Sequence, residues 1–120
     1  MADSVKAQAQ ACIQTNRFEE ARLLYEQICH TNPRDAEAWF LLGAVNGQLG
    51  RLEDAIACCH QVIALQPGNA DAHYNLAQAC MHQGRYREAA EAYQEVVRMQ
   101  PRRIEALNNL GYALQHIGRH

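Results

Sequence analysis

The chain has 120 residues and a formal net charge of −2, with 48% hydrophobic and 20% charged residues. This slightly acidic balance excludes the basic surface on which nucleic-acid binding depends. No uncharged apolar run reaches the ~18 residues that a membrane-spanning helix needs. Good helix formers dominate the composition and β-branched runs are scarce, which predicts an all-α fold.

The amino-terminal segment MADSVKAQAQACIQ lacks the basic region and following apolar run of a secretory signal. Five cysteines are an odd number, and a helical protein of this size does not need disulfides. These features predict a cytoplasmic, reducing location.

An internal repeat organises the chain. Pro33, Pro67 and Pro101 are 34 residues apart, and the same offset relates many other positions. In chain order, the repeat predicts one helix pair within residues 2–35, a second within 36–69 and a third within 70–103. A single helix is expected within 104–120, which makes about seven helices.

Each unit carries the stop signals of a helix–turn–helix. Asn16, Gly50 and Gly84 occupy equivalent positions, where a glycine supplies the positive φ that reverses the chain. The prolines then stop the second helix of each pair. Two other equivalent positions hold small residues, where the helices are expected to approach closely: Ala9, Gly43, Ala77 and Gly111, and Ala21, Ala55 and Ala89.

The second and third units carry a family pattern. The segment AEAWFLLGAVNGQLGRLEDAIACCHQVIALQPGN resembles a tetratricopeptide repeat, and ADAHYNLAQACMHQGRYREAAEAYQEVVRMQPRR is similar. The signature positions are held by Trp39, Leu42, Gly43, Ala55 and Pro67 in the first of these segments and by Leu76, Gly84, Ala89, Tyr93 and Pro101 in the other.

The resemblance covers the whole chain, although the first unit is more divergent because Gln8 replaces the usual leucine and Asn16 the usual glycine. It implies a right-handed superhelical solenoid of antiparallel helix pairs. Residues 1–120 are expected to form a single domain that is part of a longer protein.

The stretch ACCHQ, residues 57–61, raises the question of a metal or redox site. Cys58 aligns with apolar or small residues of the other units, Cys59 aligns with Tyr25 and Tyr93, and His60 aligns with polar residues. Neighbouring residues on a helix point about 100° apart, so they do not converge on one ion. We expect buried structural thiols, with no metal and no cofactor; a metal or redox role is the alternative.

The resemblance implies that the first helix of each pair lines a concave face. Helical phase then predicts the residues of this groove, which is expected to bind a peptide. They are Asp3, Lys6, Gln10 and Gln14 in unit one; Glu37, Phe40, Leu41, Ala44 and Gln48 in unit two; Asp71, Tyr74, Asn75, Gln78 and His82 in unit three; and Glu105, Asn108, Asn109, Tyr112 and His116 in the last.

This lining suits an extended peptide. Amides such as Asn75 and Asn109 both donate to and accept from a peptide backbone, while Phe40, Tyr74 and Tyr112 offer apolar contact. The prediction is a protein–protein interaction module that binds a peptide segment of a partner. The alternative is an ordinary solvated face.

One specialisation of the family is not expected here. Chaperone-binding members grip a terminal carboxylate with lysine, asparagine and arginine from three units. Lys6 matches the first lysine, but Gln10, Leu41, Asp71 and Asn75 depart from the pattern. An acidic Asp71 would repel a carboxylate.

A second comparison concerns the asparagines. Asn75 and Asn109, one unit apart, are similar to the asparagine ladder of O-linked N-acetylglucosamine transferases, which holds the backbone of protein substrates. Leu41 and Ala7 interrupt the ladder in the earlier units. An alternative function is therefore a substrate-docking or regulatory arm of a larger glycosyltransferase- or sulfotransferase-like enzyme.

The chain itself is not expected to be an enzyme, because it shows no glycine-rich phosphate loop and no convergent catalytic group. His82 and His116 share a position in adjacent units. They are interpreted as ordinary groove residues, and the alternative is a protonation near pH 6 that changes the groove charge.

The last helix is expected to leave an apolar face open. Leu110, Gly111 and Leu114 lose the partner helix that covers their equivalents upstream. Terminal repeats normally carry a polar outer face. The sequence therefore predicts either a longer array or a homo-oligomer formed through this helix.

Overall fold

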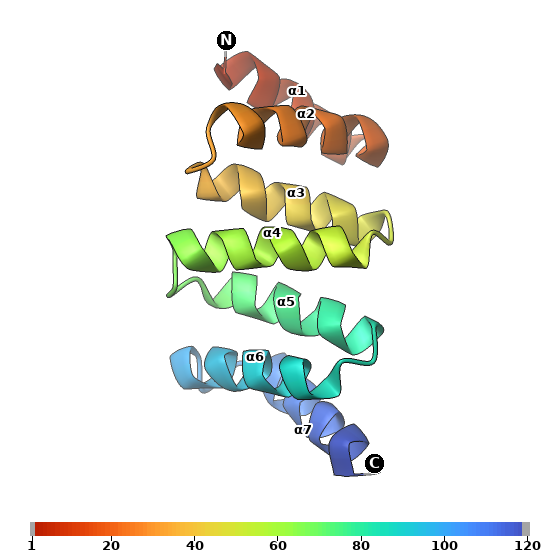
Figure 1. Cartoon of the computed structure of the whole chain (residues 1–120), viewed down its shortest axis with the longest axis vertical. Coiled ribbons are helices and arrows are strands. Elements are labelled where there is room, and N and C mark those ends of the chain that lie inside the picture. Colours follow the sequence, from red (N-terminus) through yellow and green to blue (C-terminus); the bar gives the residue numbers. More distant parts are fainter. Residues whose placement is uncertain (1, 119–120) are drawn as a thin grey trace.

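The computed structural model describes residues 2–118, with side chains from residue 4 onward. This part of the chain forms seven α-helices and no strand. Figure 1 shows them stacked along the long axis of the molecule, from α1 at the amino-terminal end to α7 at the carboxyl-terminal end. The helices are α1 (Ala2–Gln14), α2 (Phe18–Thr31), α3 (Ala36–Gln48), α4 (Leu52–Leu65), α5 (Ala70–His82), α6 (Tyr86–Met99) and α7 (Ile104–Gly118).

The helices repeat at the offset of the sequence. The odd-numbered helices begin at Ala2, Ala36, Ala70 and Ile104, and the even-numbered helices follow the same spacing. Each helix packs on the next along the chain, and α3 also contacts α5 directly. The described chain measures 49 × 25 × 21 Å, as expected for a stack in which each unit touches only its neighbours. The predicted all-α repeat solenoid is confirmed.

The turn inside each helix pair has a left-handed residue. Asn16, Gly50 and Gly84 have φ values of 60°, 75° and 74°. The amide one residue later donates to a carbonyl five residues back, as Arg85 does to Cys80 at 2.8 Å. This bond satisfies a carbonyl that the helix end would otherwise leave unpaired.

The turn between pairs is closed by side chains and by the proline segment. The Asp35 carboxylate accepts from the amide of Ala38 at 3.1 Å, and Asn69 caps α5 in the same way. The Trp39 indole donates to the carbonyl of Pro33 at 2.8 Å. Asp35 and Asn69 therefore fix the starts of α3 and α5, and Trp39 ties α3 to the proline segment before it.

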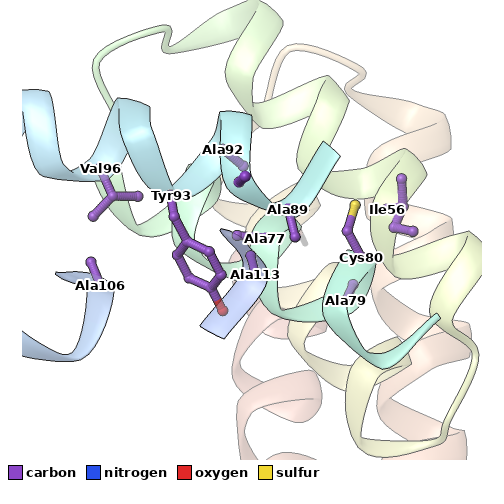
Figure 2. Close-up of a cluster of buried hydrophobic side chains, with 11 residues drawn as sticks. Ile56, Ala77, Ala79, Cys80, Ala89, Ala92, Tyr93, Val96, Ala106 and Ala113 are labelled. Atoms are coloured by element: carbon purple, nitrogen blue, oxygen red, sulfur yellow. The ribbon is translucent and has the colours of Figure 1, made fainter. Parts of the chain in front are cut away.

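Small residues allow the helices to approach closely. Ala9, Ala77 and Ala89 have no exposed surface. A Cβ added at Gly43 would lie 3.1 Å from the Cβ of Cys58 in α4, so glycine lets α3 and α4 approach closely without displacing Cys58. Figure 2 shows the larger apolar cluster, in which Tyr93 of α6 lies beside alanines of α5 and α7.

The last helix lacks cover, as predicted. Leu114 of α7 is 48% exposed, whereas its equivalent in α3, Asn46, is 2% exposed. Ile104, Leu107 and Tyr112 are also exposed.

Among the described residues, no helix is both long and apolar enough to span a bilayer.

Candidate functional site

The cysteines belong to the core. All five are buried and free of disulfides, whereas His60 is exposed. Burial raises the pKa of the Cys29 and Cys59 thiols to about 12 and of Cys58 and Cys80 to about 11, so the reactive thiolate is disfavoured. Across residues 4–118, no group of three His, Cys, Asp or Glu side chains is placed to hold a metal ion.

The predicted groove residues lie on the odd-numbered helices, and each one with a described side chain is exposed or half-buried. Asp3 falls outside the described side chains. Eleven are exposed: Gln10, Gln14, Glu37, Ala44, Gln48, Asp71, Gln78, His82, Glu105, Asn108 and Tyr112. The half-buried ones are Lys6, Phe40, Leu41, Tyr74, Asn75, Asn109 and His116.

Five of these residues meet at one hollow of about 320 Å³, here called the α3–α5 hollow. They are Ala44 and Gln48 from α3 and Asn75, Gln78 and His82 from α5. The rest of the lining was not predicted, and it comprises Gly43 and Gly47 of α3, Leu52, Ala55 and Cys59 of α4, and Ala79 of α5.

The hollow exists because α3 lacks a side chain at Gly47. A Cβ added there would meet no atom within 4 Å. The equivalent positions hold Ile13 in α1 and Met81 in α5, and both side chains are half-buried against core clusters. The sequence already indicated this opening, because Gly47 stands where the first and third units have the larger residues Ile13 and Met81.

The polar groups of the hollow are available for a ligand. The Asn75 amide has no hydrogen bond to any described residue, whereas the Asn109 amide donates to the Tyr74 hydroxyl at 3.2 Å. The two predicted ladder residues therefore differ: Asn75 is free to bind a backbone, and Asn109 is engaged within the protein.

The Tyr74 side chain contacts Tyr93, Arg103 and Asn109. Its ring meets Tyr93 edge-on at 5.7 Å, and the Arg103 guanidinium lies 4.2 Å from its centroid. Arg103 also pairs with Asp71 at 2.8 Å. Arg103 was not predicted as a site residue; its guanidinium neutralises Asp71 and covers one face of the Tyr74 ring.

Several other predicted groove residues make contacts within the fold. Lys6 pairs with Asp35 at 2.6 Å, and Leu41 packs against the amino-terminal core cluster. The His116 ring stacks on Tyr86 of α6 at 4.3 Å. These contacts reduce the part of the face that is open to a ligand.

A family model for the tetratricopeptide repeat matches residues 6–59, 47–102 and 83–120. These segments run without a break from residue 6 to the last residue. No curated protein sequence matches the chain.

Solved structures share the fold. The first TPR of Spaghetti (RPAP3), bound to the HSP90 peptide SRMEEVD, is 20% identical with a TM-score of 0.90 over 98% of this chain and 93% of that one. MamA is 24% identical with a TM-score of 0.93, over 98% and 68%. An O-GlcNAc transferase mutant from Thermobaculum terrenum is 22% identical with a TM-score of 0.79, over 94% of this chain and 22% of that one. At these identities the likeness concerns the fold alone.

Proposed function

Because the chain belongs to the tetratricopeptide repeat family, whose domains generally mediate protein–protein interaction, we propose that its concave face binds an extended peptide segment of a partner protein. The observation that carries this proposal is the α3–α5 hollow, where an apolar cavity meets the unpaired amide of Asn75. An amide beside an apolar cavity suits a peptide, because it pairs with the backbone while a side chain is buried.

The relatives of the same fold support a peptide over other ligands, since one of them holds the peptide SRMEEVD. We propose a different peptide for this chain. Leu41 and Asn75 replace residues of the carboxylate-binding pattern, and Asp71 is already paired with Arg103. An acidic carboxyl terminus would find no Lys or Arg side chain in the lining of the hollow.

The test removes both free amides of α5. Asn75→Ala with Gln78→Ala is expected to weaken binding of a groove-selected peptide by about 2 kcal/mol, roughly thirtyfold in Kd. The peptide is obtained by panning a displayed library of random linear peptides against the purified chain. Fluorescence anisotropy of the labelled peptide then gives the affinity.

A matched control is Gln27→Ala with Gln94→Ala, because both amides are exposed on even-numbered helices, away from the hollow. This control is expected to bind as the wild type does. Equal affinity of all three proteins would exclude the groove as the binding surface. A docking arm of a larger enzyme would use the same groove, so this test applies to that alternative too.

A second candidate function, self-association, is favoured by the open face of α7. Ile104 is 66% exposed, in addition to the exposed Leu107 and Leu114. We propose that this face packs on a second copy, and that Leu107→Glu with Leu114→Glu yields a monomer. Sedimentation equilibrium at high micromolar concentration checks this, and a wild type that is already monomeric would contradict it.

The proposed setting is the cytoplasm. Its support is chemical, because the buried thiols are all unpaired and a reducing compartment keeps them so.

A further inference from the structure

We propose that the α3–α5 hollow is a specificity pocket that takes one apolar side chain of the bound peptide, of isoleucine, leucine or methionine size. This inference rests on the proposed function and adds the chemistry of the peptide. It follows from the lining of the hollow, from the equivalent positions of neighbouring units and from the charges around the groove.

The lining is apolar inside and uncharged at its edge. Its buried members are Gly43, Ala55, Cys59 and Ala79, and its exposed polar members are amides and one histidine. The lining contains no Asp, Glu, Lys or Arg. Because burial of an unpaired charge is costly, a charged ligand side chain is disfavoured there and an apolar one is favoured.

The chain itself indicates what size fits. Ile13 and Met81 occupy the position of Gly47 in the neighbouring units, where they are half-buried against the cores. In unit two the same position has no side chain, and a Cβ placed there has open space around it. A ligand side chain of comparable size would complete the packing that the other units complete with their own residues.

The charges at the starts of the odd-numbered helices bear on the rest of the peptide. Glu37 and Glu105 are exposed on the odd-numbered helices and form no ion pair with any described residue. Asp71 is neutralised by Arg103. Peptides whose other residues are neutral or basic are therefore expected, and acidic ones are disfavoured.

The test fills the hollow with a side chain of the protein itself. Gly47→Met introduces the residue that unit three already holds at the equivalent position, and an added Cβ there meets no atom within 4 Å. Gly68→Met is the control, because it makes the same exchange in the turn between α4 and α5, outside the hollow, where an added Cβ also meets nothing within 4 Å. Circular dichroism confirms that both variants are folded.

The probes are the peptides selected from the random library, each made also with its apolar residue changed to serine or aspartate. Gly47→Met is expected to weaken binding roughly thirtyfold, and Gly68→Met is expected to leave it unchanged. The serine and aspartate peptides are expected to bind the wild type at least as weakly as the parent peptide binds Gly47→Met.

The outcomes separate the two proposals. If peptides lose affinity on Asn75→Ala with Gln78→Ala but bind Gly47→Met normally, the groove binds peptides and the specificity pocket is wrong. The pocket is equally wrong if selected peptides share no apolar residue. If every selected peptide binds Asn75→Ala with Gln78→Ala and also Gly47→Met with wild-type affinity, both proposals are overturned.

Discussion

Replacing Tyr93 with alanine is expected to lower the free energy of unfolding by about 3–5 kcal/mol, the range for deleting a large buried aromatic side chain. Tyr93 is 1% exposed and lies in the cluster that joins α5, α6 and α7 (Figure 2). Its ring also supports Tyr74, which it meets edge-on at 5.7 Å. Urea denaturation followed by circular dichroism measures the change.

The matched control is Tyr25→Phe in the first unit. Tyr25 is equally buried, but its hydroxyl has no hydrogen-bond partner in the described structure. Removing that hydroxyl is therefore expected to leave stability unchanged or to raise it slightly. A Tyr93→Ala protein as stable as the wild type would show that the last helix does not depend on this cluster.

Gly84→Val is expected to lower the free energy of unfolding by about 2–3 kcal/mol, because a β-branched residue would have to adopt a left-handed backbone. Gly84 has a φ of 74° in the turn between α5 and α6. A Cβ there would meet no atom within 4 Å, so backbone conformation alone causes the loss. The same denaturation experiment measures it.

Gly84→Asn distinguishes the conformational cause from any other. Asn16 adopts a φ of 60° at the equivalent turn of the first unit, so the chain itself shows that asparagine fits. We expect the asparagine variant to lose much less stability than the valine variant. Equal losses for the two variants would exclude the backbone as the cause.

The repeat register could be predicted because each unit reuses the same local chemistry. The 34-residue spacing of the prolines gave the helix pairs, and the positions of Gly50 and Gly84 gave the reversing turns. The burial of Cys58 and Cys59 was also predictable, because helical phase decides which side of a helix packs. The open face of α7 followed from the same comparison between units.

The sequence predicted which face of the helices carries the candidate site, but not the contacts among its side chains. Helical phase placed Tyr74, Asn75 and Asn109 on it, but it gave no sign that Asn109 donates to Tyr74 or that Arg103 covers the Tyr74 ring. These contacts join residues about one unit apart in the sequence. They depend on the distance and angle between α5 and α7, which phase along a single helix does not contain.

By itself, then, the sequence determined the family, the helix pairs, the turns and the side of each helix that is buried, since all of these arise from interactions within a unit or between similar units. The tertiary structure alone decided which of the exposed side chains remain free and where the hollow opens. The missing side chain at Gly47 becomes a cavity only because α3, α4 and α5 pack around it at fixed separations.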